Sequence, residues 1–234
     1  MPPEFCRFPD AYFANHIMTF ESQPFEIICF GDSLTLGFQS PTVSKPNVES
    51  IPYGMYLQEW LGDRGRVNVR GVCGETTHDM RLRFHEDVLV PHPHVVVILG
   101  GTNDLGWGIA PSEIMENLSF FYFQAKAAGI MPIAVTVPSI GGMEEREEWD
   151  WAENSVEPTL AISTALALRL TLNQAIQEIG TQHQFPVVDL FVETCDPETK
   201  VLASRYSNDG LHLTTTGYKK LAALLWNEVI GDLL

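Results

Sequence analysis

Short apolar runs alternate with longer amphipathic stretches along most of the chain. Four runs are mostly apolar, as in strands buried on both faces of a parallel sheet, and a fifth alternates with polar residues. The expected strands are residues 26–31, 67–72, 95–99, 132–137 and 186–191. Helical spacing of apolar residues, with capping residues at the ends, predicts helices over 52–60, 76–89, 111–128, 159–181 and 214–229. Strands that alternate with helices predict a doubly wound α/β domain with a mostly parallel sheet.

Three stretches fall outside this alternation. Residues 1–24 show no clean periodicity and are interpreted as an N-terminal arm, which leaves residues 25–234 as a single domain. Residues 36–51 are rich in turn formers and are expected to form a loop over the mouth of the sheet. The acidic segment 139–157 is either a solvated surface or a flap over an acyl pocket. In the flap hypothesis the pocket is lined by Phe38, Trp107, Trp149 and Trp151.

The composition of the chain limits the classes of molecule that it is expected to bind. The 234 residues are 45% hydrophobic, and 14 Lys and Arg against 30 Asp and Glu give a net charge of -16. Such a charge repels phosphate backbones and anionic bilayers, so we expect neither nucleic acid nor stable membrane association. The N-terminus lacks the apolar run of a signal peptide, and a cytoplasmic protein is the default expectation. Cys29 and Cys73 lie in apolar runs and are predicted to be small core residues.

Polar residues suited to acyl transfer follow the expected strands. Ser33 comes directly after the first strand, Gly74 after the second and Asn103 after the third, while Asp209 and His212 precede the last helix. Ligands of open α/β sheets bind at the carboxyl ends of the strands. A serine becomes nucleophilic beside a histidine base, which an aspartate orients. Backbone N–H groups and an amide can stabilise the tetrahedral oxyanion.

Each residue also has a simpler interpretation. Asp32 or Ser33 can cap a helix, Gly74 can be a turn glycine, and Asn103 or Asp209 can be a turn residue. His212 alone can be a packed or solvated histidine. Their joint occurrence in this order favours a common site.

Four segments resemble the sequence blocks of the SGNH hydrolases, also called the GDSL esterase/lipase family. The blocks are Gly31-Asp32-Ser33-Leu34-Thr35, Gly74, Gly101-Thr102-Asn103-Asp104 and Asp209-Gly210-Leu211-His212. The resemblance implies a flavodoxin-like three-layer fold with a five-stranded sheet. It implies Ser33 as nucleophile, His212 as base and Asp209 as its orienting partner. It further implies an oxyanion hole formed by the Ser33 amide, Gly74 and Asn103.

We therefore predict a serine esterase that forms an acyl-enzyme on Ser33 and acts on a small-molecule ester with a small acyl or acetyl group. No cofactor and no metal is expected, because the spacing of His85, His92 and His94 fits no ligand set. A lysophospholipase or thioesterase of the same family remains an alternative. So does a non-catalytic flavodoxin-like binding module. The oligomeric state stays open.

Overall fold

The computed structural model describes residues 24–42, 46–141 and 158–234. The predicted N-terminal arm, apart from Pro24, lies outside the described residues. So does most of the acidic segment 139–157, including Trp149 and Trp151.

Five parallel strands form one sheet in the order β2-β1-β3-β4-β5. The strands are β1 (Phe25–Gly31), β2 (Gly65–Gly71), β3 (Val95–Leu99), β4 (Met131–Val135) and β5 (Val187–Val188). This is the flavodoxin-like order, in which consecutive connections leave β1 in opposite directions. The predicted α/β class and five-stranded sheet are confirmed.

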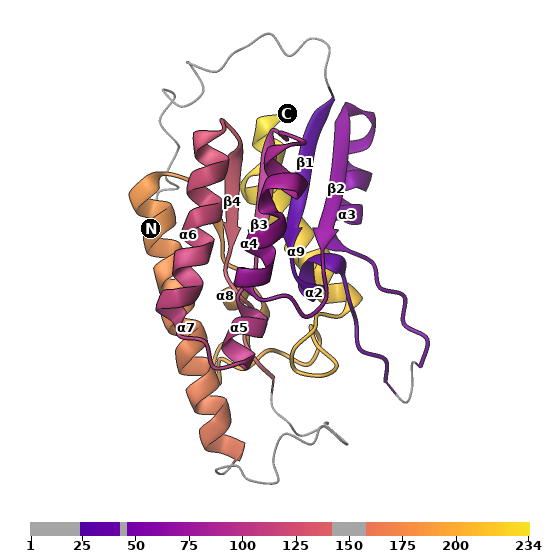
Figure 1. Cartoon of the computed structure of the whole chain (residues 1–234). Coiled ribbons are helices and arrows are strands. Elements are labelled where there is room, and N and C mark those ends of the chain that lie inside the picture. Colours follow the sequence, from indigo (N-terminus) through magenta and orange to yellow (C-terminus); the bar gives the residue numbers. More distant parts are fainter. Residues whose placement is uncertain (1–23, 43–45, 142–157) are drawn as a thin grey trace, which may run out of the picture.

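Helices cover both faces of the sheet (Figure 1). On one face lie α3 (Tyr53–Leu61) and α9 (Thr215–Glu228). On the other lie α4 (Thr77–Phe84), α6 (Pro111–Ala127) and α7 (Pro158–His183). A π-helical turn, His85–Leu89, extends α4, and the 3₁₀ turns Gly62–Arg64 and Ile230–Leu233 follow α3 and α9.

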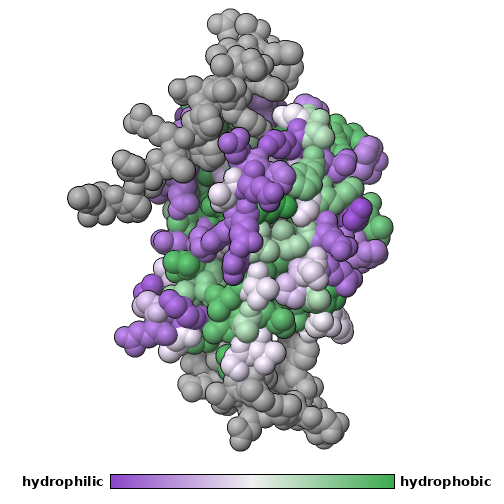
Figure 2. Space-filling view, turned by 90° about the vertical axis from the view of Figure 1, so that its left-hand side faces the viewer, coloured by the Kyte–Doolittle hydropathy of each residue, from purple (hydrophilic) through white to green (hydrophobic). Residues whose placement is uncertain are grey.

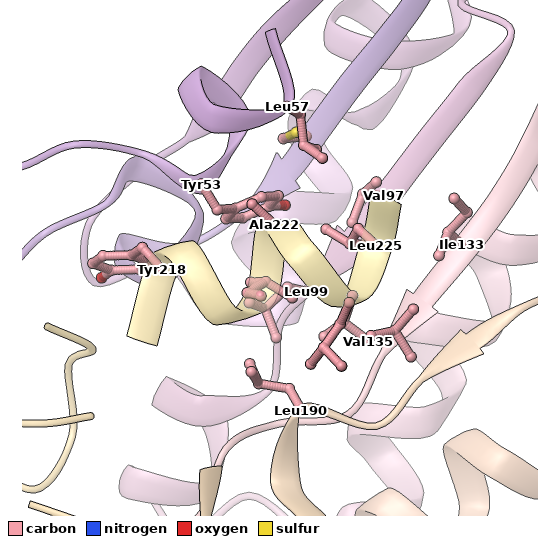
Figure 3. Packing of buried hydrophobic residues seen from close by; sticks show 14 of the residues in the cluster. Tyr53, Leu57, Val97, Leu99, Ile133, Val135, Leu190, Tyr218, Ala222 and Leu225 are labelled. Carbon is pink, nitrogen blue, oxygen red and sulfur yellow. The ribbon is translucent and has the colours of Figure 1, made fainter. Parts of the chain in front are cut away.

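The strand period of two divides the core between these faces. In β1, Ile27 and Cys29 belong to the cluster under α3 and α9, whereas Ile28 and Phe30 belong to the cluster under α4, α6 and α7. Figure 3 shows the first cluster, where Ala222 and Leu225 of α9 pack over the strands beside Tyr53 of α3. A continuous apolar run is therefore required in β1, because both of its faces are buried.

Three short helices lie in segments for which the sequence pattern predicted turns or a strand. They are α2 (Ser33–Leu36), α5 (Thr102–Gly106) and α8 (Leu190–Thr194). The strand predicted over 186–191 is wrong beyond Val188, because the Asp189 side chain accepts the Val192 N–H and caps α8. The fourth strand likewise ends at Val135 rather than at residue 137.

The surface in Figure 2 mixes hydrophilic and hydrophobic areas, as expected where apolar atoms supply more than half of a protein's accessible area. Within the described ranges, none of the helices combines the length and the apolar character that a bilayer crossing requires.

Candidate active site

A tight turn carries Ser33 at the carboxyl end of β1. Asp32 is the N-cap of α2, and its carboxylate accepts the Leu34 N–H at 2.9 Å. Ser33 is the first residue of α2 and is only 6% exposed. Gly31 precedes the turn because a Cβ there would lie 2.1 Å from the Leu99 carbonyl oxygen. The helix-cap interpretation of Asp32 is therefore correct, and the cap also fixes the position of Ser33.

Asp209 and His212 form a hydrogen-bonded pair within one turn. His212 Nδ1 lies 2.7 Å from Asp209 Oδ2, and Oδ1 accepts the backbone N–H groups of Leu211 and His212 at 2.8 and 2.7 Å. A carboxylate only accepts hydrogen bonds, so Nδ1 carries the proton and Nε2 is left as the basic nitrogen. The pair therefore has the tautomer that a general base requires.

Further donors hold Asp209 in its ionised form. The Ser40 hydroxyl donates to Oδ2, and the Ser207 hydroxyl lies 3.3 Å from Oδ1. Burial alone raises the pKa of Asp209, but the hydrogen bonds from His212 and Ser40 outweigh it and hold that pKa well below its usual range.

Phe38 connects the Ser33 turn to the histidine. The Phe38 N–H donates to the Ser33 carbonyl at 3.0 Å, and its ring lies edge-on to the His212 ring at 4.6 Å between centroids. The Tyr218 hydroxyl of α9 donates to the Phe38 carbonyl at 2.5 Å. The segment after α2 therefore brings residues from the two ends of the chain to one edge of the sheet.

The loop after β2 lies beside the same turn. The Val72 N–H continues the strand pairing by donating to the Gly31 carbonyl at 3.1 Å. Gly74 has a φ of +81°, and nothing lies within 4 Å of the position of an added Cβ. Glycine is thus needed at Gly74 for its backbone angle rather than for space.

Asn103 ties the loop after β3 to the loop after β2. Its side-chain amide donates to the Glu75 carbonyl at 2.8 Å, and the second amide proton can serve a substrate oxygen. The neighbouring Asp104 is buried, and both of its carboxylate oxygens accept the Thr77 N–H at 3.0 Å. Ser33, Gly74 and Asn103 thus follow three adjacent strands, at the point where the strand order reverses.

Asp32 is a second buried carboxyl group at this edge. Its Oδ2 atom is buried without a hydrogen-bond partner among the described atoms. Burial raises the pKa of Asp32 to about 7, while the Leu34 N–H and the charge of His212 act in the opposite direction.

The comparison with known families identifies this arrangement. Residues 29–220 match the model of the GDSL-like lipase/acylhydrolase family. The chain belongs to this family. It is an ester-bond hydrolase, and the resemblance inferred from the four sequence blocks is confirmed.

Individual proteins resemble this GDSL-like acylhydrolase in sequence or in fold. The uncharacterized lipoprotein YqeF of Bacillus subtilis (strain 168) is 26% identical over 213 residues, which cover 82% of this chain and 84% of YqeF. The crystal structure of a GDSL-like lipase from Bacteroides thetaiotaomicron is 25% identical with a TM-score of 0.70, and covers 91% of this chain and 93% of its own. Axe2, an acetylxylan esterase from Geobacillus stearothermophilus, shares the fold with a TM-score of 0.68. At 18% identity, the match covers 88% of this chain and 94% of the Axe2 chain.

Some contacts of this acylhydrolase carried no signal in the sequence pattern. Ser40 reaches Asp209 across 169 positions, and Arg83 reaches the Gly31 carbonyl across 52 positions. Asp104 belongs to a recognised block, yet its role as the acceptor for Thr77 follows only from the structure.

Other predictions about the site have mixed outcomes. Cys73 is exposed beside Gly74, so its prediction as a core residue is wrong, whereas Cys29 is buried. The apolar run that suggested a core position for Cys73 extends past the end of β2. Two of the residues that the flap hypothesis placed in the acyl pocket are described. Trp107, directly after α5, is 76% exposed, and Phe38 contacts His212. Among the residues that the structure describes, no three His, Cys, Asp or Glu side chains gather as metal ligands.

Proposed function

We propose that the chain is a serine esterase that hydrolyses carboxylic esters through an acyl-enzyme on Ser33. The observation that carries the proposal is the Asp209–His212 pair, with Nδ1 at 2.7 Å from the carboxylate and Phe38 linking the histidine to Ser33. A histidine oriented in this way accepts a proton through Nε2.

In the proposed reaction, Ser33 Oγ attacks the ester carbonyl carbon and transfers its proton to His212. The oxyanion is stabilised by the backbone N–H groups of Ser33 and Gly74 and by the Asn103 amide, each donor contributing about 3–4 kcal/mol. The intermediate then expels the alcohol, which takes the proton from His212. Water, deprotonated by His212, attacks the carbonyl carbon of the acyl-enzyme. The second tetrahedral intermediate then releases the acid, and His212 returns the proton to Ser33 Oγ. Asp209 remains ionised throughout, consistent with its lowered pKa.

An open, shallow groove lies beside Phe38, next to the proposed site. The groove has a volume of about 510 Å³ and is lined by Phe38, Gln39, Pro41, Pro46, Asn47, Val48, Glu49 and Ser50. Because His212 protonates the leaving alcohol, the groove next to Phe38 suits that alcohol. The exposed amide of Asn47 favours a hydroxyl-bearing alcohol, and Glu49 together with the net charge of -16 disfavours a phosphate-bearing one. An acetylated sugar, the substrate class in the name of Axe2, fits this description.

Intact mass after treatment with a fluorophosphonate tests the nucleophile. We expect one adduct on the wild type, none on Ser33→Ala, and an unchanged adduct on Ser112→Ala, whose serine is exposed at the start of α6. An adduct that persists in Ser33→Ala would overturn the proposal, and no adduct on folded wild type would favour the binding-module alternative.

A series of acyl esters with one alcohol then tests the acyl preference. We expect the highest kcat/KM for acetyl esters and a decline with chain length. A maximum at long chains or thioesters would favour the lysophospholipase or thioesterase alternative. The cytoplasmic location and the lack of membrane and nucleic-acid partners stay predictions from the sequence.

A further inference from the structure

Arg83 of α4 makes more polar contacts than an ordinary surface arginine. Its side chain is 19% exposed. Nε donates to Glu75 at 2.7 Å, Nη1 to Asp87 at 2.6 Å and Nη2 to the Gly31 carbonyl at 2.9 Å. Nη1 also lies 3.2 Å from the Arg70 carbonyl, and the guanidinium lies 4.4 Å from the centroid of the Phe30 ring. The planar group is therefore fixed on one face and along both edges.

Two of these partners adjoin the donors of the proposed oxyanion hole. The Gly31 carbonyl ends β1, two residues before Ser33. Glu75 directly follows Gly74, and the Glu75 carbonyl accepts the Asn103 amide at 2.8 Å. One guanidinium thus joins the turn of Ser33 to the loop of Gly74, and Asn103 is attached to the same loop.

We propose that Arg83 is a positioning residue that holds the three donors of the oxyanion hole in register. The inference rests on the proposed function of Ser33, Gly74 and Asn103. Donors stabilise an oxyanion without reorganisation only when they are held in place before the reaction. Displacements of about 1 Å can cost a hundredfold in rate. Gly74 is exposed and has no side chain to pack, so the loop is anchored beside it by the contacts of its neighbour Glu75 with Arg83 and Asn103.

The geometry requires an arginine. Its rigid fork reaches the carboxylate and the carbonyl at once, whereas a lysine ammonium is a single point charge on a flexible stem. Arg83→Lys should therefore satisfy one partner and lose the other, and its activity should lie between those of the wild type and Arg83→Gln.

The two acidic partners of Arg83 provide a matched pair of variants. Glu75 and Asp87 each form an ion pair with Arg83, with 18% and 26% side-chain exposure, but only Glu75 belongs to the Gly74 loop. Glu75→Gln and Asp87→Asn each remove one negative charge beside the same guanidinium. A purely structural ion-pair role predicts similar effects of both on the melting temperature and no effect of either on kcat.

Steady-state kinetics on an activated acetyl ester, with melting temperatures measured in parallel, test the inference. We expect Arg83→Gln and Glu75→Gln to lower kcat about tenfold to a hundredfold, less than the loss of a whole donor causes. KM should stay within about twofold, because the hole binds the transition state more strongly than the substrate. Asp87→Asn should stay within about twofold of the wild-type kcat, and the fluorophosphonate labelling rate should fall in parallel with kcat.

An unchanged kcat in Glu75→Gln, or equal losses in Glu75→Gln and Asp87→Asn, would overturn the role of Arg83. The matched pair decides the question even if Arg83→Gln fails to fold. Failure of the proposed function has a different signature, namely activity or labelling of the wild type that does not require Ser33.

Discussion

The Ser40 hydroxyl donates to the same carboxylate oxygen of Asp209 that accepts the Nδ1 proton of His212. Ser40 belongs to the segment after α2, and the Asn208 side chain donates to its carbonyl at 3.2 Å. This segment therefore contacts Asp209 directly and His212 through Phe38.

We predict that Ser40→Ala lowers kcat about threefold to tenfold, because a hydrogen bond to a charged group contributes about 1.5–3 kcal/mol and only part of that orients the histidine. Steady-state kinetics on an activated acetyl ester measure this loss. Ser112→Ala, which changes an exposed serine at the start of α6, is the control. A wild-type kcat in Ser40→Ala would contradict the coupling.

The stability of the protein should depend on pH through Asp32. Its pKa is about 7 in the folded protein and about 4 when unfolded, so the native state keeps a proton that the unfolded state releases. The free energy of unfolding should therefore fall as pH rises from 4 to 7, by up to about 4 kcal/mol from this group.

Asp32→Asn keeps the acceptor for the Leu34 N–H and removes the titration. Urea unfolding of both proteins at pH 5 and pH 8 should give a stability difference that favours the variant more at pH 8. A difference independent of pH would show that Asp32 does not titrate in this range.

Gly74→Ala should separate strain from catalysis. An L-residue at φ +81° costs about 1–2 kcal/mol, and a shifted Gly74 N–H should lower kcat by at least about tenfold. Gly129 has a φ of +78° and equally open space around it. It precedes β4 and therefore lies at the amino ends of the strands, away from the site. Gly129→Ala should therefore lose similar stability and keep its kcat. Equal kcat values for the two variants would exclude the Gly74 N–H from the reaction.

Asp104→Asn should destabilise the protein by about 1–3 kcal/mol, since the new amide protons would face the Thr77 N–H and leave buried donors unpaired. The shift of the urea midpoint at constant m-value measures this loss. Asp79→Asn, which changes an exposed carboxylate on α4, the helix that begins at Thr77, should shift the midpoint less. If Asp79→Asn costs as much, the buried position of Asp104 is not the cause.

The sequence predicted the parts of the fold that depend on local patterns. Residues 95–99 form β3 as expected, because a run of five apolar residues suits a strand buried on both faces. The helix that begins at Pro111 also matches, with proline at its first turn. The run 186–191 misled because its apolar residues pack equally well as two residues of strand and the start of α8, and the Asp189 cap decides between them.

The site, too, has parts that local sequence patterns predict and parts that they do not. Ser33, Gly74, Asn103, Asp209 and His212 follow expected strands or precede an expected helix, so their common edge could be inferred from the order of elements. The contacts of Ser40 and Arg83 join segments far apart in the chain. No local period or motif encodes which distant carbonyl or carboxylate such a side chain reaches.

Asp209 and His212 lie only three residues apart, with the backbone N–H of His212 bonded to the same carboxylate. The acid–base pair can therefore survive when the C-terminal segment detaches, whereas its distance to Ser33 and its contact with Ser40 depend on the tertiary structure. That distance relies on Phe38, which α9 holds through Tyr218. Partial opening of α9 should abolish turnover while most of the sheet is still folded, which makes enzymatic rate an early reporter of local unfolding.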